Sequence, residues 1–189
     1  MIELLYPAAT AHLIGERDMS SEMVPVVDSL GRVVAQASKS RCHDVSDPLT
    51  HPFVRLQVVD RFSKFYLQRR SDKRSNFPLK WDAAVAGHVS YGEYFEEALY
   101  RKAYEQVRLR DFNPILIDNY MLPEECPVDA MVNLYLAVGT YPFVADNYEV
   151  CEGRWWTMDE IEKALGTDVF TPAFEWEYQH YKDKFLAFL

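Results

Sequence analysis

The chain has 189 residues, of which 49% are hydrophobic, enough to bury the core of one globular domain. Its 29 Asp and Glu outnumber its 20 Lys and Arg, and the formal net charge of −9 repels phosphate backbones and argues against a nucleic-acid partner. Three cysteines without a CxxC pair argue against a disulfide framework or a zinc ribbon and favour a reducing compartment. No apolar run approaches roughly 18 residues, so we expect a cytoplasmic protein without membrane contact.

The first half of the chain predicts paired strands. Two short apolar runs flank the turn-forming residues 29–32, a pattern typical of a hairpin. Two later runs alternate apolar and polar residues around a second turn, as half-buried antiparallel strands do. Residues 71–78 are turn formers and cations and predict an exposed loop, and an apolar stretch ending in Gly87 predicts a buried strand. The predicted strands are residues 24–28, 33–36, 53–59, 65–70 and 80–87.

An amphipathic helix is predicted after a glycine-containing loop at residues 87–92. Its apolar residues recur at every fourth position, and charged residues occupy another face with the same spacing. The apolar positions are Phe95, Leu99, Ala103 and Val107, and the charged positions are Glu97, Arg101 and Glu105.

The rest of the chain adds strands and two helices. Thr157 and Glu160 form the pattern of a capping box for a helix through residue 165, and Thr171 before Pro172 is typical of the start of a last helix. The predicted strands are residues 114–122, 131–139 and 153–157. Together these elements predict a mixed sheet flanked by helices, an α/β architecture.

Residues 87–109, GHVSYGEYFEEALYRKAYEQVRL, place a glycine loop before a carboxylate-rich helix. This arrangement can hold Mg²⁺ against a diphosphate, because that cation prefers oxygen ligands and shares those of the phosphates. The stretch resembles the Nudix box, G-x5-E-x7-R-E-U-x-E-E-x-G-U, in which U is aliphatic. The matching positions are Gly87, Glu93, Arg101, Glu105 and Leu109. The stretch departs at Lys102 and Gln106, where the family has metal-binding glutamates, and at Arg108, where it has glycine.

Within that family the chain is similar to the isopentenyl-diphosphate isomerases and the hydrolases related to them. The stretch FYLQRR, a cationic loop and then FPLKWDAAVAGHVSYGE follow the isomerase order of strand, basic loop, tryptophan strand and glycine-histidine pair. The resemblance implies a Nudix-type α/β/α sandwich with a mixed sheet over residues 24–189, preceded by an N-terminal extension, residues 1–23. It also allows a homodimer.

The same resemblance implies a set of site residues. Arg70 and Arg74 fall where the isomerases hold diphosphate, and Lys102 falls on a basic residue that replaces a box glutamate in those enzymes. The implied metal ligands are His51, His88 and Asp129, and a third histidine position falls on Asp44, with His43 beside it. Isomerase chemistry is not expected, because the catalytic cysteine and a second catalytic carboxylate are replaced by Ala86 and Met131, which offer neither acid nor base.

Three functions stay open at this point. The first is a hydrolase with a weakened Mg²⁺ or Mn²⁺ site that cleaves a diphosphate linkage in a nucleotide-like or prenyl-like small molecule. The second is a module that binds a diphosphate metabolite without turnover, and the third is an interaction scaffold with an empty pocket. For the hydrolase, the expected residues are Glu105 and Glu93 in catalysis, Arg70, Arg74, Lys102 and Arg101 on the substrate, and Glu105, Glu97, His51, His88 and Asp129 on the metal.

Three simpler interpretations also follow from the sequence. Glu93, Arg101 and Glu105 have the spacing of ion pairs that merely brace a helix and its loop. The aromatic residues near the C-terminus are expected to pack in the core, and the three cysteines are expected to have no catalytic role.

Overall fold

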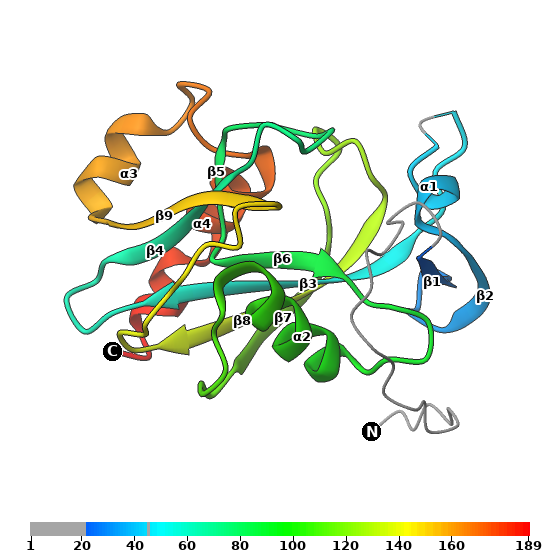
Figure 1. Cartoon of the computed structure of the whole chain (residues 1–189), viewed down its shortest axis with the longest axis horizontal. Coiled ribbons are helices and arrows are strands. Elements are labelled where there is room, and N and C mark those ends of the chain that lie inside the picture. The colour runs from blue at the N-terminus through cyan, green and yellow to red at the C-terminus, as the bar shows by residue number, and fades with distance from the viewer. Residues whose placement is uncertain (1–21, 45) are drawn as a thin grey trace.

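A computed structural model describes residues 22–44 and 46–189, so most of the predicted extension lies outside the described residues (Figure 1). The strands are β1 (Met23–Val27), β2 (Val33–Ser38), β3 (His51–Val59), β4 (Phe65–Arg70), β5 (Trp81–Asp82), β6 (Val85–His88), β7 (Ile115–Met121), β8 (Ala130–Val138) and β9 (Val150–Trp156). The helices are α1 (Lys39–Cys42), α2 (Phe95–Val107), α3 (Met158–Ala164) and α4 (Pro172–Leu186). Within the described part, no helix has both the length and the apolar character needed to cross a membrane.

Seven strands form one mixed sheet, which confirms the predicted α/β architecture. Its path runs β5-β4-β3-β8-β7, with β6 paired to β3 and β9 paired to β4. The β3–β8 pair is parallel and the other pairs are antiparallel. In the β3–β6 register Phe53 pairs with His88 and Arg55 with Ala86, so each pair directs its side chains to the same face of the sheet.

Helices cover both faces of this sheet (Figure 1). The predicted apolar side of α2 packs on one face, where Leu99 and Ala103 are fully buried against Val54 and Leu56 of β3. On the other face α3 and α4 bury a cluster that includes Phe174. Each such large apolar side chain stabilises the fold by about 1.5–3 kcal/mol through burial.

A short helix that the sequence pattern did not predict follows the β1–β2 hairpin. In α1 the Ser38 hydroxyl accepts a hydrogen bond from the Arg41 amide at 3.3 Å, which caps the helix. Lys39 and His43 are four residues apart and therefore share one side of this turn. The hairpin and α1 lie beside the end of β3 where His51 begins the strand (Figure 1).

The single strand predicted over residues 80–87 is wrong, because this stretch forms two short strands. β5 pairs with β4, whereas β6 pairs with β3. At the end of β5 the carboxylate of Asp82 accepts a hydrogen bond from the amide of Ala83 at 2.8 Å and contacts Arg55 at 2.5 Å. These contacts turn the chain at residues 83–84, a tertiary effect that apolar patterning cannot show.

Candidate active site

Three histidines from different elements meet at the end of β3. His43 follows α1, His51 opens β3 and His88 ends β6. One ring nitrogen from each histidine lies within 4.8 Å of the others. Among the described His, Cys, Asp and Glu residues, these three form the group that could hold a metal ion. The rings of His51 and His88 are stacked, with centroids 5.0 Å apart, and Nε2 of His43 lies 2.8 Å from Nε2 of His88.

Burial keeps these imidazoles neutral, which is the form that can donate a lone pair to a metal. Burial, aided by the nearby His51 and Lys39, lowers the pKa of His43 to about 4. Burial also lowers the pKa of His51 and holds that of His88 well below its ordinary value. All three rings are therefore uncharged at neutral pH.

His51 shows that the residues present fit a metal. Its Nδ1 donates to the carbonyl of Leu49 at 2.8 Å, which fixes the tautomer and leaves Nε2 as an acceptor. That Nε2 atom is buried and has no hydrogen-bond partner, an arrangement that is costly in a protein interior. A set of imidazole nitrogens suits Mn²⁺, Zn²⁺ or a similar transition metal, whereas Mg²⁺ prefers oxygen ligands.

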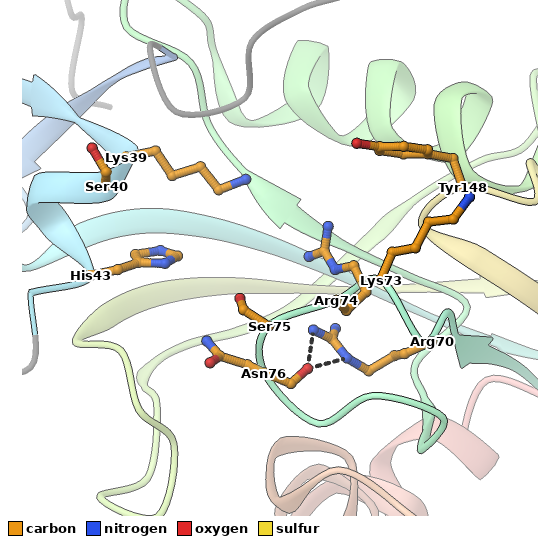
Figure 2. A pocket seen from close by; sticks show the side chains of 9 residues that line it. All are labelled: Lys39, Ser40, His43, Arg70, Lys73, Arg74, Ser75, Asn76 and Tyr148. Atoms are coloured by element: carbon orange, nitrogen blue, oxygen red, sulfur yellow. Dashed lines mark hydrogen bonds between the residues drawn. The ribbon is translucent and has the colours of Figure 1, made fainter.

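A cationic pocket of about 320 Å³ opens beside the cluster, and His43 belongs to both. Figure 2 shows the Lys39 side chain extending from α1 toward the guanidinium of Arg74. The lining residues are Lys39, Ser40, His43, Arg70, Lys73, Arg74, Ser75, Asn76 and Tyr148. Four cations and no aliphatic side chain line this pocket, so it suits a polyanion.

The predicted substrate residues Arg70 and Arg74 both line this pocket. Arg70 also braces the loop over it, because Nε and Nη2 donate to the carbonyl of Asn76 at 3.0 and 2.8 Å. Burial lowers the pKa of Arg70. Arg74 pairs with Glu149 at 3.2 Å, and its side chain is 23% exposed. These contacts hold the cationic loop in place beside the histidines.

Arg101 and Glu93 brace the loop before α2. Arg101 donates to both carboxylate oxygens of Glu93, at 2.6 and 2.7 Å, and to the carbonyl of His88 at 3.1 Å. Glu93 also accepts the amide of Ser90 at 3.0 Å. The simpler interpretation therefore describes this pair, and neither residue lines the cationic pocket.

Lys102 lies against the glycine that begins the box. A Cβ built on Gly87 would come within 2.6 Å of Cδ of Lys102, so the lysine stem fills the space that glycine leaves. Its Nζ is buried and lies 3.0 Å from Glu105 and 3.9 Å from Glu149. Lys102 does not line the pocket that Arg70 and Arg74 share, which argues against its predicted contact with substrate.

Gln106 pairs with the free edge of β6. Its Nε2 donates to the carbonyl of Ala86 at 2.8 Å and to Glu149 at 2.7 Å, and its Oε1 accepts the amide of Ala86 at 3.2 Å. Although burial alone would raise it, the charges of Lys102 and Arg74 hold the pKa of Glu149 below its ordinary value. Glu149 is therefore a buried, ionised partner of the box.

Two predicted metal ligands have other partners. Glu97 accepts the amide of Tyr94 at 2.8 Å and so caps α2, which removes it from our candidate ligands. Asp129 accepts the hydroxyl of Thr50 at 2.5 Å, although its charge still acts on His51. Neither carboxylate belongs to the histidine group.

Buried ion pairs occupy the sheet face that carries Ala86. Arg55, the register partner of Ala86, contacts Asp82 at 2.5 Å and Glu177 of α4 at 2.6 Å. Gln57 donates to Glu177 at 2.7 Å, and Tyr120 also bonds this carboxylate. Although burial alone would lower it, the two carboxylates hold the pKa of Arg55 well above its ordinary value.

Sequence reasoning missed several residues of the site. His43 was noted only as the neighbour of Asp44, the position implied for a third histidine ligand. Lys39 and Tyr148 reach the pocket from α1 and from an irregular segment before β9, and Glu149 follows Tyr148. The available signal was the spacing of Lys39 and His43, which places them together only if a helical turn forms there.

Comparisons with known proteins agree with the predicted family and the fold. A family model described as NUDIX domain matches residues 50–176, more than half of the chain. An uncharacterized Nudix hydrolase of Yersinia pestis is 29% identical over 151 residues, which cover 80% of each chain. An isopentenyl-diphosphate Delta-isomerase of Brevibacterium linens is 27% identical over 175 residues, which cover 86% of this chain and 91% of that protein.

Solved structures share the architecture at low identity. The protein DR0079 of Deinococcus radiodurans superposes with a TM-score of 0.69 and 18% identity, covering 87% of this chain and 99% of that one. The NUDIX domain of NrtR from Shewanella oneidensis, solved with ADP ribose, gives a TM-score of 0.58 and 12% identity over 78% of this chain and 97% of that one. At these identities the likeness concerns the fold.

Proposed function

Because the chain belongs to the Nudix family, we propose that it hydrolyses a diphosphate linkage in a nucleotide-like small molecule. The observation that carries this proposal is the position of His43, which belongs both to the three-histidine cluster and to the cationic pocket. A candidate metal centre and a candidate phosphate site are therefore contiguous.

In this proposal the cationic residues and the histidines have different roles. Lys39, Arg70 and Arg74 bind the phosphate oxygens and offset their charge, which also lowers the cost of the charge that develops when the linkage breaks. His43, His51 and His88 would hold a transition metal, which supplies a Lewis acid beside the phosphates when bound. The brace between Arg101 and Glu93 keeps the His88 end of β6 fixed while this happens.

The lining of the pocket favours a nucleotide-like over a prenyl-like substrate. Tyr148 is an exposed residue that lines the pocket, with Nζ of Lys73 5.3 Å from its ring centroid, and such a ring can stack on a base. A prenyl chain needs an apolar surface, and no lining residue is aliphatic. The NrtR domain, which shares the fold, was crystallised with ADP ribose, so the fold can hold a compound of this class.

The face around Ala86 gives a second argument against isomerase chemistry. Arg55, Asp82 and Glu177 are almost completely buried there. An allylic chain placed on that face would have to displace buried ion pairs, which costs far more than an apolar wall. Ala86 itself supplies no acid or base.

Phosphate release from nucleoside diphosphates, nucleoside diphosphate sugars and prenyl diphosphates in the presence of Mn²⁺ or Zn²⁺ tests the proposal. We expect turnover with a nucleotide-like compound, lost in His51→Ala and in Arg74→Ala. Arg61→Ala, which removes an exposed arginine in the β3–β4 turn, is the matched control and keeps full activity. Turnover confined to prenyl diphosphates, or unchanged in His51→Ala, contradicts the proposal.

A module that binds the diphosphate compound without cleaving it is the second candidate. The observation that favours it is the pair Lys102 and Gln106, which replaces metal-binding glutamates of the box with residues that cannot ligate Mg²⁺ as carboxylates do. This candidate predicts thermal stabilisation by a nucleoside diphosphate, lost in Arg74→Ala, with no phosphate release under any metal condition.

A further inference from the structure

We infer that the Nudix box of this chain is closed to divalent cations because its own nitrogen atoms occupy the oxygen ligands. Nζ of Lys102 and Nε2 of Gln106 belong to the two positions where the family has metal-binding glutamates. They contact the oxygens that remain there, those of Glu105, Glu149 and the Ala86 carbonyl. This inference concerns the box alone and does not depend on the proposed reaction.

The amide of Gln106 uses every hydrogen-bonding position that it has. Its two N–H groups donate to the Ala86 carbonyl and to Glu149, at 2.8 and 2.7 Å. Its oxygen accepts the Ala86 amide at 3.2 Å and the Gln68 side-chain amide at 3.3 Å. A buried primary amide with four partners has nothing left to offer a metal.

The orientation of this amide follows from its partners. Exchanging its oxygen and nitrogen would place oxygen against the Ala86 carbonyl and the Glu149 carboxylate, and nitrogen against the Ala86 amide. Each of these pairs would repel. The group that faces the two oxygens is therefore a donor, which stands in for the positive charge of a cation.

Lys102 also keeps divalent cations out of the box, both through its charge and through the space that its side chain fills. Two cations, Lys102 and Arg74, face two carboxylates, Glu105 and Glu149, at 3.0 to 3.9 Å. The carboxylates are therefore paired before any metal arrives. The lysine stem also fills the space above Gly87, where a Cβ would come within 2.6 Å of it.

It follows that the box and the histidine cluster differ in their ability to bind a metal ion. Oxygen ligands that suit Mg²⁺ are bound internally in the box, whereas the nitrogen ligands of the histidine cluster include an unpartnered buried atom, Nε2 of His51. A metal should bind this chain through imidazoles, and Mg²⁺ should not bind it at the box.

Metal binding to the full chain tests this directly, with thermal unfolding and Mn²⁺ electron paramagnetic resonance as readouts. In the wild type we expect no stabilisation by Mg²⁺, and one Mn²⁺ site that is lost in His51→Ala and kept in Glu105→Gln. A Mg²⁺-dependent stabilisation of the wild type that disappears in Glu105→Gln overturns the inference. This arm uses no variant of the two nitrogen-bearing residues, so it stands even if those variants fail to fold.

A second experiment tests whether substitutions can create a Mg²⁺ site in the box. Gln106→Glu places a carboxylate against the Ala86 carbonyl and Glu149, so Mg²⁺ should stabilise this variant, and the combination with Lys102→Gln should bind Mg²⁺ at least about tenfold more tightly by freeing Glu105. Gln106→Met is the matched control and should gain nothing. A folded Gln106→Glu, Lys102→Gln double variant that ignores Mg²⁺ contradicts the inference.

Discussion

The box and the histidine cluster adjoin the same short strand, β6, but they differ in whether their buried polar atoms have hydrogen-bond partners. In the box the amide of Gln106 has four partners, and Lys102 lies between two carboxylates. In the cluster the His51 ring keeps a buried nitrogen without a partner. Folding penalises such an atom. Among the described residues, Gln57, Gln68 and Trp156 also carry one, but His51 is the one that belongs to the group able to hold a metal ion.

The largest effect is expected on metal affinity, when the His51 imidazole is removed. His51→Ala should weaken Mn²⁺ or Zn²⁺ binding at least about 100-fold, because one of three ligands is lost. Changing only a hydrogen-bond partner of a metal ligand already costs about 10- to 100-fold in affinity. Isothermal titration calorimetry measures this, with the exposed His180→Ala of α4 as control. Equal metal affinity in the two variants would remove the distinction between the cluster and the box.

A strong effect on stability is expected from Gly87→Ala. The new methyl group must displace the Lys102 stem, and overpacking of this kind costs about 1–3 kcal/mol of unfolding free energy. Urea denaturation measures it, and the same change in a Lys102→Ala background should cost much less. Additive losses would mean that the lysine stem does not fill the box.

An intermediate effect is expected on pyrophosphate affinity when Arg74 is removed. Arg74→Ala should weaken pyrophosphate binding about tenfold, or roughly 1.4 kcal/mol, because it removes a charge-assisted hydrogen bond. Calorimetry at fixed ionic strength measures this, and Arg61→Ala should leave the affinity unchanged. Equal losses in the two variants would indicate a general charge effect.

The smallest effect is a pH dependence. Burial lowers the pKa of Lys39 to about 8, with Glu22 and Glu149 raising it and Lys102 and Arg74 lowering it. The ammonium is charged below that pKa and loses its proton above it, so pyrophosphate affinity should fall about fourfold between about pH 7 and about pH 8.5. Lys39→Arg should abolish this fall, and a fall that persists in the arginine variant would assign it to another group.

Much of the sheet and the whole of α2 could be predicted from the sequence, because alternation and the four-residue repeat are local signals. α1, the break at residues 83–84 and the role of Gln106 could not, since each depends on contacts between distant elements. Gln106 looked like a lost ligand, whereas its amide pairs with β6. Glu149 lies in an irregular segment with no periodicity, and nothing in its surroundings marked it as a partner of the box.

The ion pairs of Arg55 carry a consequence for the order in which the chain becomes stable during synthesis. Arg55 lies in the central strand β3, but one of its two carboxylate partners, Glu177, belongs to the last helix, α4. A nascent chain that ends before α4 lacks both Glu177 and the helix that covers this face, so Arg55 would keep Asp82 as its carboxylate partner on an uncovered face. We therefore expect the face of β3 that carries Arg55 to complete its packing only after the C-terminal helix has left the ribosome.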